Sequence, residues 1–211
     1  MDEAAGGSVS PDGTRIAYVP IVPGHGDSNE LRVMDSDGEN VRTIASAGTQ
    51  DQPNSTEGWI YPEVWSPGGQ RVAYIERHLI AAPRSGDRPA ISIRTTNADG
   101  SASTVVLDDP RIGPALWWVP DGRILFAYRG DSAAEGNNYG IYSIQVDERT
   151  GRAIGQPRQI TKAEGFVSGM SASSDGRRPV LWRENKSWQP FITELNPICE
   201  CFPGSGVIAV V

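Results

Sequence analysis

The chain has 211 residues, of which 38% are hydrophobic, and its formal net charge at pH 7 is −7. This length allows one or two domains with a sizeable core, and an acidic surface repels phosphate backbones, so we expect no nucleic acid among the partners. No run of about 20 apolar residues is present, so we expect no membrane-spanning segment in this chain.

The first segment that predicts structure is a tight turn followed by an apolar strand. In this turn Pro11 presets φ, Asp12 can bond neighbouring backbone, and Gly13 tolerates a positive φ. These properties favour a hairpin that is closed by a type I turn and a bulge. The strands expected in this first unit cover residues 7–9, 15–19, 30–34 and 41–44.

The same turn recurs three times along the chain, each time before an apolar strand. Its closing glycines lie at positions 13, 69, 122 and 176, so successive copies are 53 to 56 residues apart. A near-constant period of this kind indicates a repeat architecture. We assign a structural turn role to the residues of the later copies, which are Gly69, Pro120, Asp121, Gly122, Asp175 and Gly176.

Three further units repeat the order of strands in the first. Apolar residues that alternate with polar ones indicate half-buried strands. The expected strands are 61–65, 71–76, 90–94 and 104–107 in the second unit, 115–118, 123–128, 140–144 and 158–161 in the third, and 167–172, 180–183, 190–195 and 206–211 in the fourth. The last of these segments does not resemble the fourth strands of the earlier units.

Each unit is therefore expected to be one four-stranded antiparallel sheet. A single small sheet cannot bury both of its faces, whereas sheets stacked face to face around an axis can, and this predicts an all-β β-propeller. We place the blades at about 7–45, 61–107, 114–161 and 167–211. The sequence allows a closed four-bladed propeller or an open arc of a larger, six-bladed type. An open arc would leave unpaired sheet edges, from which we expect self-association.

The repeated pattern resembles the WD-like propeller repeat of TolB-type proteins over nearly the whole chain. The third unit, residues 113–123 with 147–151 and 156–161, resembles propellers fused to bacterial serine/threonine protein kinases. Similar propellers also follow winged-helix regulators. The resemblance implies a non-catalytic sensor or interaction module, and it is compatible with a periplasmic or extracytoplasmic location. The family usually has six or more units and this chain has four, so we expect a fragment of a larger signalling protein.

Segments that suggest catalysis or metal binding each have a simpler structural explanation. Residues 169–173 fall one residue short of a nucleophile elbow and read as a strand. Residues 35–40 begin like a calcium loop but lack the downstream glutamate and fit a hairpin turn. Cys199 and Cys201 are two thiols with no nearby histidine to complete a zinc site. We therefore expect no enzyme activity, cofactor or metal. The first seven residues have neither a basic start nor an apolar run, so we expect no secretory signal in this chain.

Three aromatic residues are the candidates for a binding surface. Trp59 and Tyr61 are placed at the end of a long polar loop, and Trp117 lies in a lead-in strand. Inter-blade loops line one face of a propeller, so we expect a protein or small-molecule ligand on that face. The alternative for these side chains is ordinary packing. The functional alternative is the propeller of a prolyl-oligopeptidase-like hydrolase that lacks its catalytic domain.

Overall fold

Every element in the described part of the chain is a β-strand. The computed structural model describes residues 4–22, 26–27, 29–47, 55–80, 89–129, 138–162, 165–172, 179–184 and 188–192. No helix occurs in these ranges, so none of the described residues forms an apolar helix long enough to cross a membrane. The strands form separate antiparallel sheets, which confirms the expected all-β class.

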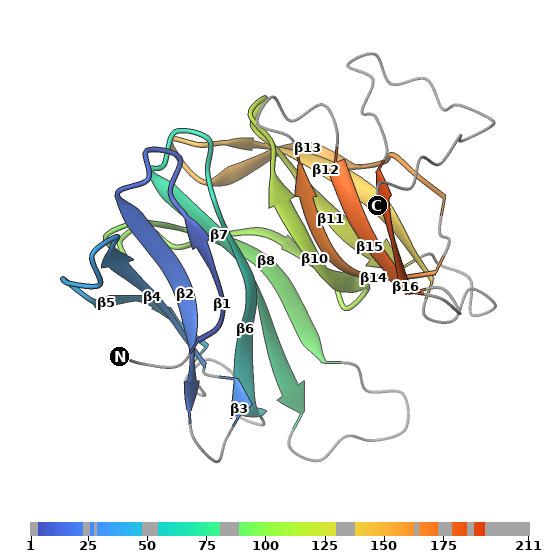
Figure 1. Cartoon of the computed structure of the whole chain (residues 1–211). Helices are drawn as coiled ribbons and strands as arrows, with labels where there is room; N and C mark the ends of the chain where they lie inside the picture. Colours follow the sequence, from blue (N-terminus) through green and yellow to red (C-terminus); the bar gives the residue numbers. More distant parts are fainter. Residues whose placement is uncertain are drawn as a thin grey trace. The chain divides into compact units, whose positions relative to one another are not determined.

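The first two sheets have four successive main strands each, in the order of the chain (Figure 1). Their inner positions are apolar in alternation, as in β4, where Leu31 and Val33 are buried and their neighbours are half-buried. The strands of the first sheet are β1 (Ala4–Val9), β2 (Arg15–Val22), β4 (Glu30–Asp35) and β5 (Arg42–Ser46), with the short β3 (Gly26–Asp27) paired to β2. Those of the second are β6 (Ser55–Trp65), β7 (Arg71–Ile80), β8 (Ala90–Asn97) and β9 (Thr104–Asp108).

The third and fourth sheets follow the same order. The third sheet contains β10 (Ile112–Trp118), β11 (Arg123–Arg129), β12 (Tyr139–Asp147) and β13 (Arg152–Gln159). The fourth contains β14 (Phe166–Ala172), β15 (Pro179–Glu184) and β16 (Trp188–Ile192) among the described residues. The strand expected at 206–211, the turn residues Asp175 and Gly176, and both cysteines lie outside the described residues.

Two strands begin six residues earlier than the sequence predicts, which is the largest such difference among the described strands. β6 starts at Ser55 rather than at residue 61, because β7 extends to Ile80 and its added length pairs with the earlier residues. Trp59 and Tyr61 therefore lie within a strand and not at the end of a loop. β13 covers Arg152–Gln159 rather than 158–161, and its mostly exposed residues carry no apolar alternation that could have revealed it.

The recurring turn has the same hydrogen bonds in the first two sheets. The N–H of Gly13 donates to the Ser10 carbonyl at 2.8 Å, and that of Gly69 donates to the Ser66 carbonyl at 2.9 Å. The φ angles of Gly13, Gly69 and Gly122 are 73°, 67° and 86°, the left-handed region that favours glycine. Each turn thus returns the chain into its hairpin at the point where the period predicts it.

The chain divides into two compact units. The first contains residues 1–110 together with 147–153, and the second contains 111–146 with 154–211. The core of the first unit lies between its two sheets and joins Val19, Leu31 and Val33 to Val72 and Tyr74. The core of the second unit joins the sheet of β10–β13 to that of β14–β16, and its members are Ala115, Val119, Leu125, Ala127, Ile141, Val167 and Leu181.

Polar contacts between the first two sheets fix one blade on the next. The Arg15 guanidinium lies over the Trp65 ring at 4.8 Å and donates to the Gly69 carbonyl at 2.8 Å. Trp65 Nε1 donates to the Ser8 carbonyl at 2.9 Å. These contacts give hydrogen-bond partners to the polar groups of two large side chains at the interface between the sheets. They therefore fix the orientation of one sheet on the other in addition to packing it.

A buried arginine holds the segment 147–153 within the first unit. Arg71 is 1% exposed, and its guanidinium donates to Asn97 Oδ1 at 2.5 Å and to the Ala102 carbonyl at 2.5 Å. Thr95, which also accepts from Arg71, donates to the Gly151 carbonyl at 3.0 Å. Burial lowers the pKa of Arg71, while the nearby carboxylates of Asp147, Asp99 and Glu148 act in the opposite direction.

Candidate functional site

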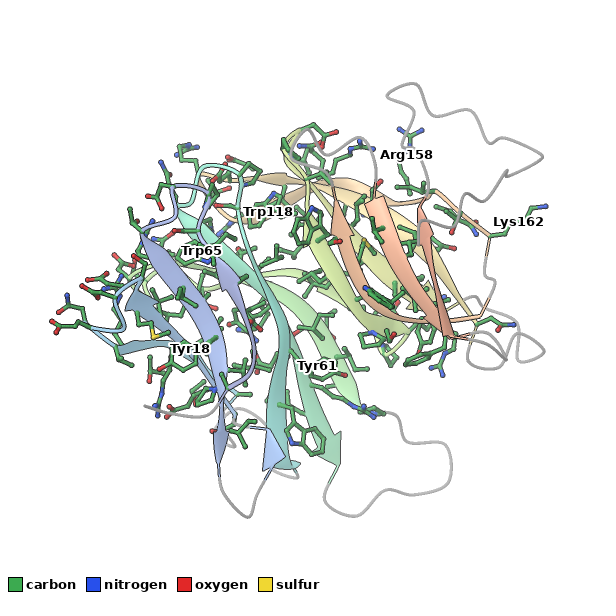
Figure 2. The ribbon with its side chains drawn as sticks, in the orientation of Figure 1. Tyr18, Tyr61, Trp65, Trp118, Arg158 and Lys162 are labelled. Carbon is green, nitrogen blue, oxygen red and sulfur yellow. The ribbon has the colours of Figure 1, made fainter. Side chains whose placement is uncertain are left out.

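The candidate site is the end of the second sheet where β6 begins and β7 finishes. In Figure 1 this end is the lower one of the first unit, opposite the turn at Gly69. Figure 2 shows Trp65 near the turn and Tyr61 further along the same strand toward the candidate site. We call this region the loop end of the second sheet and define it by Trp59, Tyr61, Glu76, Arg77, His78 and Arg94.

Two of the three aromatic candidates lie on β6 at this end. Trp59 and Tyr61 are both half-buried, and the residue between them, Ile60, is fully buried in the core of the first unit. The register of β6 against β7 shifts between Ile60 and Glu63, so a bulge interrupts the ladder next to Tyr61. Bulges re-aim side chains, which is one way in which a strand presents residues to a ligand.

Trp117 belongs to the second unit. It lies on β10, is half-buried, and packs against the core cluster that contains Leu125 and Val167. This contact is the packing alternative stated for the aromatic candidates. We therefore build the site on Trp59 and Tyr61, and a binding role for Trp117 stays a prediction.

An ion network closes one face of the loop end. The Glu76 side chain is 9% exposed, and its Oε1 lies 2.5 Å from His78 Nε2. Its other oxygen, Oε2, forms an ion pair with Arg94 Nε at 3.2 Å. The His78 Nδ1 atom is buried and has no hydrogen-bond partner among the described residues. A carboxylate shared by two basic groups in a site of low exposure holds β7 and β8 in fixed register.

The repeat itself does not require this network. The residues that occupy the same place as Glu76, five positions after the first arginine of the strand, are Pro20 in β2 and Tyr128 in β11. Tyr128 is buried and its ring lies 4.8 Å from that of Tyr142. Neither the first nor the third sheet therefore has a carboxylate at this position, and the second sheet does.

Glu63 is a half-buried acid on β6, opposite Tyr74 in the strand register. Burial raises the pKa of Glu63 to about 7, while a hydrogen bond from its own backbone acts in the opposite direction. Burial likewise raises the pKa of Tyr74, against hydrogen bonds from Ser103 and Arg94. Perturbed titratable groups of this kind cluster at functional sites, although structural networks also produce them.

The segment that begins like a calcium loop, residues 35–40, and the repeat segment that contains Asp12 are both turns. Hydrogen bonds from the Ser10 hydroxyl and then from Thr14 lower the pKa of Asp12 to about 2. At residues 35–40 the φ of Gly38 is 89°, and Asn40 Nδ2 donates to Asp35 Oδ2 at 2.6 Å. Within the described ranges no group of three or more histidine, cysteine or acidic residues could hold a metal ion.

The sequence pattern did not lead us to Glu76, His78 or Arg94, although the residue types on this strand could have pointed to them. Glu76, Arg77 and His78 are three consecutive ionisable residues in what the pattern predicts as a half-buried strand or the loop after it. A charged residue at a position that alternation assigns to the core is costly unless it is paired. That conflict between pattern and residue type could have identified the loop end as a functional region.

Comparisons with known proteins identify the fold of this chain but do not assign it to a family. No protein-family model matches the chain, and no curated protein matches it. Among solved structures it is similar to an oligogalacturonate lyase in complex with manganese, with 20% identity and a TM-score of 0.62 over 93% of this chain and 51% of that chain. TolB from Acinetobacter baumannii is 22% identical with a TM-score of 0.58, over 88% of this chain and 40% of that one.

A third similar structure is a puromycin hydrolase mutant, at 13% identity and a TM-score of 0.62, over 92% of this chain and 29% of the hydrolase. The chain spans about half or less of the length of these three proteins. Together with the four sheets, these likenesses define the class of protein: an all-β propeller. More narrowly, its fold is that of the TolB-like propellers. The finer resemblance to kinase-fused propellers stays a prediction.

Proposed function

We propose that the chain is a non-catalytic binding module, whose contact surface for a protein or small molecule is the loop end of the second sheet. The observation that carries this proposal is the combination of half-buried Trp59 and Tyr61 with an ion network that the repeat does not need. Aromatic side chains lose little conformational freedom on binding and supply large contact areas, so they are frequent at binding surfaces.

The rigid backing of this surface supports the same proposal. Glu76, His78 and Arg94 lie behind the surface on β7 and β8, and their mutual contacts limit the motion of the strands that carry it. A surface that is ordered before binding loses less entropy when the ligand arrives. In the parent protein we place this module beside a signalling domain, as the sequence resemblance of the third unit to kinase-fused propellers suggests.

The test compares three variants of the purified chain against ligands recovered from a peptide and metabolite library by thermal shift. We expect Trp59→Ala and Tyr61→Ala each to weaken binding of a recovered ligand at least tenfold in calorimetry. Trp182→Ala is the matched control, because Trp182 is 50% exposed on β15, in the other unit. Ligands that bind Trp59→Ala and Tyr61→Ala as tightly as the unaltered chain would contradict the proposed surface.

The second candidate function is the propeller of a prolyl-oligopeptidase-like hydrolase. It is favoured by the likeness to the puromycin hydrolase, of which this chain spans 29%. The two candidates differ in the domain that adjoins the propeller in the full-length protein. A hydrolase domain encoded next to this segment would favour the second candidate, whereas a kinase or regulator domain would favour the first. Peptidase or esterase turnover by the purified chain would contradict the non-catalytic proposal.

A further inference from the structure

Arg77 lies at the loop end of the second sheet and has no ion-pair partner among the residues that the structure describes. Its side chain is half-buried, and its Nε atom is buried without a hydrogen-bond partner.

The acidic residue nearest to Arg77 in sequence is already engaged elsewhere. Glu76 precedes Arg77 on β7, so their side chains point to opposite faces of the sheet, and both Glu76 oxygens contact His78 and Arg94. On its own face Arg77 lies opposite Trp59 of β6 and Ile91 of β8. Neither of these cross-strand neighbours carries charge.

The shape of this pair defines the ligand that it would accept. A guanidinium presents donors in a planar fork that matches the two oxygens of a carboxylate. A tryptophan beside it offers a flat apolar surface for the rest of the molecule. A buried donor that lacks an acceptor is unfavourable, and an incoming carboxylate would supply the acceptor.

We propose that Arg77 and Trp59 form a binding site for a small planar organic carboxylate. The Arg77 guanidinium donates its Nε–H and a terminal N–H to the two carboxylate oxygens, and Trp59 contacts the ring or chain that carries the carboxylate. This inference rests on the proposed binding function and adds the chemical class of the ligand.

The experiment uses benzoate as the probe and benzamide, which has the same shape without the charge, as its control. Nitrogen-15 NMR of the full chain follows the Arg77 Nε–H and the Trp59 indole N–H during titration at pH 7. We expect benzoate to shift both signals saturably, with a dissociation constant in the millimolar range, and benzamide to bind at least tenfold more weakly. Equal binding of the two probes would overturn the proposal. So would the absence of a saturable shift at benzoate concentrations up to about 20 mM.

Variants locate the site and separate this inference from the proposed function. Arg77→Lys is expected to lose at least tenfold in benzoate affinity, while Arg123→Lys keeps it, because Arg123 is paired with Asp121 on another sheet. If Arg77→Lys does not fold, the shifts of the Arg77 Nε–H and Trp59 indole N–H signals in the unaltered chain show whether benzoate binds at this site. Inorganic phosphate that displaces benzoate at equal concentration would show a general anion site and overturn the carboxylate assignment. A library ligand that needs Trp59 but not Arg77 would overturn this inference and leave the proposed function standing.

Discussion

Two acidic side chains of the second sheet differ in their surroundings: Glu76 is buried, and Glu63 is half-buried. Glu76 has two basic partners, whereas no side chain donates to the Glu63 carboxyl among the causes that set its pKa. Glu76 thus has basic groups that compensate its carboxylate, whereas burial disfavours the charged form of Glu63 and raises its pKa.

Replacement of Glu63 by glutamine is expected to change the dependence of stability on pH. The pKa of Glu63 is about 7 in the folded protein against a model value of 4.5, so the folded state binds this proton more tightly. The cost of burying the anion is absent below pH 4.5, grows as the pH rises, and is complete above about 7. Glu63→Gln should thus be more stable by up to about 3 kcal/mol at pH 8.

Urea unfolding at pH 4, 6 and 8 measures this effect. The two proteins should have nearly equal unfolding free energies at pH 4 and should separate progressively at pH 6 and 8. A stability difference that is the same at all three pH values would show that Glu63 is not buried as an uncompensated acid.

Removal of the Glu76 carboxylate is expected to destabilise the protein strongly. Glu76→Ala leaves His78 and Arg94 without their shared partner in a site of low exposure, and we expect a loss of about 2–4 kcal/mol. Glu30→Ala is the matched control, because the Glu30–Arg32 pair at 2.7 Å is about a third exposed on each side. That variant should lose less than about 1 kcal/mol. Chemical denaturation of both variants at pH 7 gives the comparison, and equal losses would contradict the special place of Glu76.

Among the elements, the turn that leads into β13 is the most constrained. Gly151 has φ of 72°, and a Cβ at this position would lie 2.3 Å from Thr95 Oγ1 and within contact of the Arg71 guanidinium. Gly155 in β13 has a similar φ of 82°, but no atom lies within 4 Å of the place of its Cβ. A side chain at Gly155 would therefore meet backbone strain alone, whereas one at Gly151 would also collide with Thr95 and Arg71.

Alanine at Gly151 should be much more harmful than alanine at Gly155. Gly155→Ala is expected to lose about 1–2 kcal/mol from the left-handed conformation alone. Gly151→Ala adds displacement of Thr95 and Arg71, whose buried hydrogen bonds are costly to break, so we expect a loss at least about 2 kcal/mol larger. Thermal and urea unfolding measure both, and similar losses would show that Arg71 and Thr95 move away without cost.

On the scale of the whole molecule, sheet edges and exposed apolar residues predict self-association. Val9 is 61% exposed on the edge strand β1, and Trp182 is 50% exposed in the fourth sheet. Unpaired edges and exposed aromatic side chains are surfaces on which a second chain can add. We expect sedimentation velocity to show a mass that rises with protein concentration, and Trp182→Ser to reduce the rise. A single sharp monomer peak over a hundredfold range of concentration would contradict this expectation.

Much of the fold could be predicted because its signals are local. Turn glycines such as Gly13, Gly69 and Gly122 are needed for their φ angles whatever surrounds them, and alternation in segments such as 30–34 reports burial directly. The early start of β6 and the course of β13 could not be predicted, because pairing with a longer neighbour, and not their own residue pattern, makes them strands. For this reason Trp59 and Tyr61 lie in a strand, whereas the sequence predicts them at the end of a loop.

The sequence by itself determined the class of this protein: a turn repeated every 53 to 56 residues, each copy followed by short strands that need a neighbouring sheet to be buried. The tertiary structure alone decided which charged side chains meet. It placed one oxygen of Glu76 against His78 and the other against Arg94, and it put Arg77 opposite Trp59 with no ion-pair partner among the described residues. It also put residues 147–153 into the first unit. The reason is physical, since turn chemistry acts between adjacent residues, whereas the pairing of charges depends on distances that only the folded chain sets.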